Sequence, residues 1–277
     1  MPDRRTHRGP HPEDARVFDA PAQLRLSAAA GDFRWLLSRG YPHDSALKLV
    51  GDRYDLLVRQ RTAVSRCCCS ETEAARRRSC QVAAQQLSGA ALWLDGYNVL
   101  TTIEAALADG VILAACDGTY RDMASMHGSY RKVAETLPAL ELLGGAIAAY
   151  HVAQCRWFLD RPVSNSGRLK GIIETLAAER GWPWQVELVA DPDAVLSDPP
   201  ARAEVVPVGA TVQLPDGAAV ELPPQPRELP PQPRIVVATA DSGILDRCPT
   251  WFNLAREVVA QHIPTAWVIE MRADAPS

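Results

Sequence analysis

The chain has 277 residues, of which 47% are apolar and 22% are charged, with a net charge of −4. This composition excludes a chain that is disordered throughout, and the length suits two domains of unequal size. No apolar run reaches the roughly 18 residues of a membrane span, and the opening residues lack the apolar core of a signal peptide. We therefore expect a cytoplasmic protein without a membrane partner.

The first part of the chain is basic and helical. Residues 1–85 contain 15 Lys and Arg against 10 Asp and Glu, which leaves 14 against 23 for the rest. Residues 1–22 are polar, with Pro and Arg throughout, and this composition predicts that they form a disordered lead. Over residues 23–86 apolar side chains recur at helical spacing, which predicts a small basic helical domain. Its cysteines show no CxxC pair, so we expect buried thiols and no zinc site.

Residues 87–277 change to a pattern in which apolar strands alternate with helices. Strands are predicted at "AALWLD", "CRWFLD", "WQVELVAD", "IVVATAD" and "TAWVIEM". The segments between them include helical runs such as "SGRLKGIIETLAAERG". Strands joined by crossover helices predict an α/β domain whose mostly parallel sheet has helices on both faces.

A proline-rich insertion interrupts this domain at about residues 198–234. It contains a possible hairpin around residues 215–217 and the repeat PPQPR at 223–227 and 230–234. Proline at this density does not enter a sheet, so the segment is interpreted as a linker-like surface insertion.

Aspartates follow the predicted strands at the points where the strands end: Asp95, Asp160, Asp191 with Asp193, and Asp241 with Asp246. A single Asp at such a position is often a turn residue or a helix cap. However, parallel strands end at one edge of a sheet, where several carboxylates would repel each other without a counter-charge. The pattern therefore predicts a site for Mg²⁺ or Mn²⁺, which prefer hard oxygen ligands.

Two of these segments resemble the PIN-like nucleases, and the NYN branch in particular. "LDGYNVL" is similar to the first strand and turn of that family, and "VVATADSGILDR" is similar to its later T-x-D segment. The resemblance covers roughly residues 90–272 and implies metal roles for Asp95, Asp241 and Asp246. The sequence departs from the family at the acidic position after the third strand, which only Asp191 and Asp193 offer. A short helical domain before such a domain also resembles an uncharacterised prokaryotic two-domain family.

Polar and basic residues near the strand ends are candidates for binding substrate phosphate. Hydroxyl and amide groups at a helix N-terminus form a ready anion site, and "SNSGRLK" opens a helix in this way. A plain capping role is the alternative for that segment. The predicted substrate-binding residues are Asn98, Ser164, Asn165, Ser166, Arg168, Lys170, Arg121 and Arg131. Arginines of the helical domain, including Arg76, Arg77 and Arg78, are predicted to hold a nucleic-acid backbone.

Together these patterns predict a metal-dependent endoribonuclease. Its catalytic residues would be Asp95, Asp160, Asp193 and Asp241, and its metal ligands would be Asp95, Asp160, Asp241 and Asp246. The cofactor would be Mg²⁺ or Mn²⁺, and the partner single-stranded or structured RNA. Two alternatives stay open: an RNA-binding or scaffold protein with little catalysis on the same fold, and a small-molecule phosphohydrolase.

Overall fold

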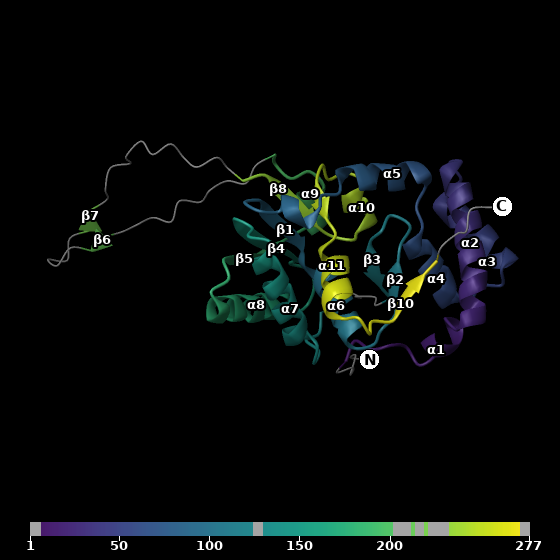
Figure 1. Ribbon diagram of the computed structural model, residues 1–277, viewed down its shortest axis with the longest axis horizontal. Coiled ribbons are helices and arrows are strands. Elements are labelled where there is room, and N and C mark those ends of the chain that lie inside the picture. Colours follow the sequence, from purple (N-terminus) through teal and green to yellow (C-terminus); the bar gives the residue numbers. More distant parts are fainter. Residues whose placement is uncertain (1–6, 124–129, 202–211, 214–218, 221–232, 272–277) are drawn as a thin grey trace.

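The computed structural model of the protein describes residues 7–123, 130–201, 212–213, 219–220 and 233–271. A helical N-terminal region precedes an α/β region (Figure 1). The helices of the first region are α1 (Asp14–Val17), α2 (Ala20–Ser38), α3 (His43–Arg53), α4 (Val58–Cys67) and α5 (Glu71–Cys80), followed by the 3-10 turn η1 (Ala84–Gln86).

The start of the chain is folded onto this helical region. Asp14 forms a bidentate ion pair with Arg59, and Val17 and Phe18 are buried in the helical core. The prediction of a disordered lead is therefore wrong for residues 7–22, because two apolar anchors and one buried carboxylate outweigh the polar composition around them. Asp19 then begins α2 by accepting a hydrogen bond from the Ala22 amide at 2.8 Å.

A parallel sheet forms the centre of the α/β region. Its strands, in the part of the chain that the structure describes, are β1 (Ala91–Asp95), β4 (Gln154–Asp160), β5 (Trp184–Val189), β8 (Ile235–Ala238) and β9 (Trp251–Phe252). They pair in the order β5-β4-β1-β8-β9, with every pairing parallel. β1 is buried on both faces: Leu92 and Leu94 enter one core, and Trp93 enters another.

Helices cover both faces of this sheet. The face that carries Leu92 packs against α6 (Gly96–Leu107), α7 (Thr136–Ala149), α8 (Ser166–Arg180) and α11 (Leu254–His262). The face that carries Trp93 packs against the short helices α9 (Pro192–Ser197) and α10 (Ser242–Leu245). The predicted fold class, an α/β protein with a mostly parallel sheet after a helical region, is confirmed.

A second, smaller sheet joins the two regions. It contains β10 (Val268–Glu270), β2 (Ile112–Ala114) and β3 (Tyr120–Asp122), with β10 parallel and β3 antiparallel to β2. Figure 1 shows this sheet between α2–α4 and the helices α6 and α11. Leu113 and Ile269 belong to the same buried cluster as Leu26 and Phe33 of α2. The N-terminal helices thus share their core with this sheet, and the last predicted strand belongs here rather than in the central sheet.

The predicted hairpin of the insertion is flanked by two short strands, β6 (Val212–Gln213) and β7 (Ala219–Val220), which pair antiparallel. Its turn, residues 215–217, and most of the PPQPR repeat lie outside the described residues. Among the helices that can be described, none is long and apolar enough to cross a membrane.

Candidate functional site

A cleft of about 510 Å³ lies at the carboxyl edge of the central sheet, where β1 and β8 end. Three of the predicted aspartates line it: Asp95, Asp193 and Asp241. Residues of the helical region also line the cleft, namely His43, Ser65 and Arg66. The cleft therefore brings together carboxylates of the α/β region and basic groups of the N-terminal helices.

Asp95 ends β1, and α6 begins at the next residue. Gly96 permits this abrupt change, because a Cβ there would lie 2.6 Å from Leu159 Cδ2 and 3.0 Å from the Phe158 carbonyl oxygen. The buried carboxylate of Asp95 accepts a hydrogen bond from Thr239 Oγ1 at 2.8 Å. Burial raises the pKa of Asp95 to about 7, and the charges of Asp241 and Asp193 add to the rise against the Thr239 hydrogen bond.

Asp241 caps α10 and also lines the cleft. Its Oδ1 atom accepts hydrogen bonds from the amides of Gly243 at 2.7 Å and Ile244 at 3.1 Å. The Asp241 amide in turn donates to Thr239 Oγ1 at 2.9 Å. Thr239 thus links the carboxylate of Asp95 to the backbone of Asp241 and fixes the segment that carries Asp241 next to the end of β1.

Asp193 reaches the cleft from the first turn of α9. Burial raises its pKa, and the charges of Asp241, Asp191 and Asp160 raise it further, while Arg247 acts in the opposite direction. Asp160 ends β4, the neighbour of β1, and does not line the cleft. Its pKa is raised by burial and then by the charge of Asp191. Asp160 therefore contributes to the field of the cleft from beside it.

Asp246 is engaged elsewhere. Its two carboxylate oxygens accept hydrogen bonds from Nε and Nη2 of Arg77 at 2.7 and 2.8 Å. Asp246 is not among the residues that line the cleft. The prediction that it is a metal ligand is therefore not supported by its position, because both its oxygens face a buried guanidinium.

The donor chemistry of the cleft fits a hard divalent cation. Asp95, Asp193 and Asp241 offer carboxylate oxygens, and their mutual repulsion is what a cation would relieve. Within the described residues, no three His, Cys, Asp or Glu side chains are grouped closely enough to hold one ion. An ion in this cleft would therefore be held by one or two carboxylates and would retain several waters.

Two predicted substrate-binding residues of the cleft use their polar groups inside the protein. Asn98 Oδ1 accepts from the Ala240 amide at 2.8 Å. Arg121 donates to the Ala240 carbonyl at 2.8 Å and to Asp117 Oδ2 at 2.7 Å. Both residues therefore position the segment after β8, on which Asp241 lies.

The predicted phosphate-binding helix start divides into structural and exposed residues. Ser166 is buried and hydrogen-bonded to Tyr97, Lys170 donates to the Val186 carbonyl at 2.8 Å, and the Ser164 carbonyl accepts from the Tyr130 amide at 3.1 Å. These contacts support capping and packing roles.

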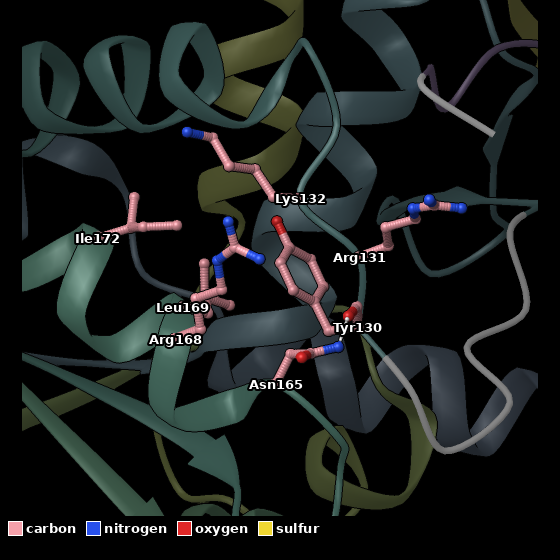
Figure 2. Close-up of a pocket in the computed structure, with 7 residues that line it drawn as sticks. All are labelled: Tyr130, Arg131, Lys132, Asn165, Arg168, Leu169 and Ile172. Carbon is pink, nitrogen blue, oxygen red and sulfur yellow. Dashed lines mark hydrogen bonds between the residues drawn. The ribbon is translucent and has the colours of Figure 1, made fainter. Parts of the chain in front are cut away.

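Asn165 and Arg168 line a separate pocket of about 270 Å³ with Arg131 and Lys132, shown in Figure 2. Asn165 Nδ2 donates to the Tyr130 carbonyl at 2.9 Å and so fixes one wall of this pocket. We call it the basic pocket; its full lining is Tyr130, Arg131, Lys132, Asn165, Arg168, Leu169 and Ile172. The Tyr130 ring packs 5.3 Å from that of Tyr97, a residue of the carboxylate cleft.

Two of the three arginines of α5 that were predicted to hold nucleic acid are engaged inside the protein, whereas Arg78 is exposed. Arg77 is 2% exposed and pairs with Asp117 and Asp246, and Arg76 donates to the carbonyls of Leu245 and Arg247. Burial alone would raise the pKa of Asp117, but the Arg121 charge and hydrogen bonds from Thr119 and Arg77 hold it below its usual value.

Several cleft residues were not predicted. Thr239 stands in the quoted "TAD" segment, two residues before Asp241, and that spacing was the available signal. Asp122 lines the cleft and accepts hydrogen bonds from Thr101 and Thr102 at 3.1 and 3.2 Å. His43 and Ser65 reach the cleft only through packing between distant parts of the chain, which no local motif indicates, whereas Arg66 is one of the arginines of the helical domain predicted to hold a nucleic-acid backbone.

Comparison with known protein families gives matches to two segments of the sequence. Residues 25–79 match a protein family of unknown function (DUF434), and residues 84–208 match a domain of unknown function (DUF5616). No solved structure matches the chain. A relative in Methanocaldococcus jannaschii, the uncharacterized protein MJ0935, is 30% identical over 156 residues, which cover 56% of this chain and 74% of the relative. The chain therefore belongs to the same family as this archaeal protein.

Proposed function

We propose that the protein is a Mg²⁺- or Mn²⁺-dependent endoribonuclease that hydrolyses phosphodiester bonds of RNA in the carboxylate cleft. The observation that carries this proposal is the convergence of Asp95, Asp193 and Asp241 from three elements on one open cleft. The charge of Asp241 raises the pKa values of Asp95 and Asp193, and carboxylates with raised pKa values in a cleft are typical of sites built for charge chemistry rather than for stability.

In this proposal Asp95 and Asp241 hold the cation. Thr239 orients the first carboxylate, and the amides of Gly243 and Ile244 orient the second, which leaves Asp241 Oδ2 for the ion. When bound, the cation would act as a Lewis acid on a phosphoryl oxygen of the substrate.

Asp193 would serve as the general base. It lies on the first turn of α9 at the cleft, and its raised pKa favours accepting a proton from an attacking water. The proton leaves the water oxygen as that oxygen forms a bond to phosphorus. The leaving ribose oxygen is protonated from solvent, because the cleft is open.

RNA is a polyanion, and the carboxylates of the cleft repel it, so basic residues elsewhere must attract it to the protein. The basic pocket offers Arg131, Lys132 and Arg168 beside Tyr130, whose ring packs against that of Tyr97, a residue of the cleft. We propose that the RNA backbone runs from the cleft to the basic pocket.

A catalytically silent RNA-binding protein on the same fold is the second candidate. The observation that favours it is that no group of three ligands with metal-binding spacing occurs in the described part of the chain. Such a protein would use the basic pocket and leave the carboxylates without a reaction.

Cleavage of end-labelled RNA by the purified protein tests the proposal. We expect cleavage with Mg²⁺ or Mn²⁺ and none in EDTA. Asp95→Asn and Asp241→Asn should each lower the rate by about 100-fold or more, because each removes one proposed ligand. Asp109→Asn is the matched control: Asp109 is exposed and has φ of 57°, which Asn adopts readily.

Full activity of Asp95→Asn would overturn the metal site. Retained RNA binding without cleavage by the wild type would favour the silent protein. Hydrolysis of a small phosphoester with no cleavage of RNA would instead identify a phosphohydrolase.

A further inference from the structure

Two cysteines face each other where the helical region meets the second sheet. Cys69 lies in the connection between α4 and α5, and Cys116 follows β2. Their sulfur atoms are 3.3 Å apart, and the Cys69 amide also lies 3.3 Å from Cys116 Sγ, to which it donates. The Cys116 amide donates to the Cys67 carbonyl at 2.8 Å, so backbone hydrogen bonds hold the two segments in register.

This pair is partly accessible. Cys69 is 5% exposed, whereas Cys116 is only half-buried. A disulfide bond is about 2 Å long, so the two sulfurs need to approach by little more than 1 Å. Most of the other cysteines are buried, and Cys80 is the other partly exposed thiol among the described residues.

The two thiols differ in acidity. The hydrogen bond from Cys69 lowers the pKa of Cys116 to about 7, helped by the Cys69 amide and Arg34 and opposed by burial and by Asp117. Donating that hydrogen bond raises the pKa of Cys69, and burial raises it further. Cys116 is thus suited to be the attacking thiolate and Cys69 the resolving thiol.

We propose that Cys69 and Cys116 are a site of reversible disulfide formation, oxidised by peroxides. The Cys116 thiolate attacks one peroxide oxygen, the O–O bond breaks, and a water leaves after protonation, which makes Cys116 a sulfenic acid. Cys69 Sγ then loses its proton and attacks Cys116 Sγ, and the S–O bond breaks to release a second water. Two thiols and one hydrogen peroxide thus give one disulfide and two waters, and a dithiol reduces that disulfide back to the two thiols while it is itself oxidised to a disulfide.

The bond would join the connection after α4 to the segment that leads into Asp117. Asp117 accepts hydrogen bonds from Arg77 and Arg121, and Arg121 lines the carboxylate cleft. Oxidation therefore fixes one wall of the cleft. This inference stands on the cysteine geometry alone and does not depend on the proposed nuclease activity.

Intact-mass measurement of the full chain before and after hydrogen peroxide tests the proposal. We expect the wild type to lose the mass of two hydrogen atoms and to regain it with dithiothreitol. Cys69→Ser and Cys116→Ser should each abolish the loss. The matched controls are Cys67→Ser, Cys68→Ser and Cys80→Ser, which should still lose the mass of two hydrogen atoms. The first two are needed because trypsin leaves Cys67, Cys68 and Cys69 in one peptide.

A peptide map of the oxidised wild type, with fragmentation of the crosslinked peptides, checks the pair without any variant. A link between Cys69 and Cys116 supports the proposal. Gain of oxygen at Cys116 with no link, or a link that persists in Cys69→Ser, would overturn it.

Discussion

Asp95 is buried, and the negative charges of neighbouring aspartates disfavour its ionised form. Its surroundings include Thr239 as a hydrogen-bond donor and Asp241 and Asp193 as like charges. No cation of the chain is paired with it among the described ion pairs. The folded protein therefore favours the protonated form, in contrast to Asp117, which two arginines hold in its charged form.

This contrast predicts a pH dependence of stability in EDTA. The folded protein retains the Asp95 proton up to about pH 7, whereas the unfolded chain releases it near the usual value of 3.8. Between those pH values the folded state binds more protons, so the free energy of unfolding falls as pH rises, by up to about 4 kcal/mol from this group. Asp95→Asn should lack this component.

Urea unfolding of the wild type and of Asp95→Asn from pH 4 to pH 8 measures this pH-dependent part of the free energy of unfolding. The variant should match the wild type near pH 4 and exceed it in stability at pH 8, and Asp109→Asn should follow the wild type throughout. A wild type that is as stable as Asp95→Asn at pH 8 would show that the carboxylate is not strained.

Helix α5 illustrates how an element can be predicted while its role is not. It lies within residues 23–86, where helical spacing predicts a helical domain, and the structure shows that it begins with a Ser70–Glu73 capping box. Its three consecutive arginines suggested an exposed basic face, but Arg77 points inward and binds Asp246, which is 169 residues away in the sequence. The same contact occupies the carboxylate of Asp246 and so removes it from the predicted metal site. Because the two residues are far apart in the sequence, no local pattern predicts this pairing.

Whether a strand can be predicted from the sequence depends mainly on its length. β1, β4, β5 and β8 are long and apolar enough to be predicted, and the aspartates at or after their ends follow from them. β2, β3 and β9 have only two or three residues each, too few for a period to be visible. Their pairing depends on tertiary packing rather than on propensity.

Arg77→Met should lower the free energy of unfolding by about 3 kcal/mol or more, because it leaves two carboxylates of the α5 contact without their guanidinium. Arg78→Met, its exposed neighbour, should change stability by no more than about 0.5 kcal/mol. Guanidinium unfolding at pH 7 compares the two variants. Equal stabilities would mean that α5 does not dock through this ion pair.

At the scale of the whole molecule, part of the positive charge of the helical region is paired within that region. Arg59 and Arg61, for example, form ion pairs with Asp14 and Asp52. The basic pocket lies instead in the α/β region, whose overall charge is negative. Summed charges over the two parts of the chain therefore did not indicate the basic pocket, where the RNA backbone is proposed to bind.

Changing Arg131, Lys132 and Arg168 together to Gln should weaken RNA binding and reduce the salt dependence of log Kd by about two units of slope, if each contacts one phosphate. The matched control changes Arg25, Arg39 and Arg78 to Gln, which removes the same charge from the helical region. Binding is measured in EDTA so that no cleavage occurs. An equal loss of slope in both triple variants would mean that net charge, and not the basic pocket, attracts RNA.

The core shared by α2 and β10 has a consequence for synthesis on the ribosome. More than two hundred residues separate Phe33 from Ile269, yet both belong to one buried cluster. At translation rates of about 5–20 residues per second, roughly 12–47 seconds pass between synthesis of the apolar face of α2 and synthesis of its last partner strand. During that interval the apolar face of α2 is exposed on the nascent chain. Chaperone binding and cotranslational aggregation should therefore concentrate at the first fifty residues of the chain.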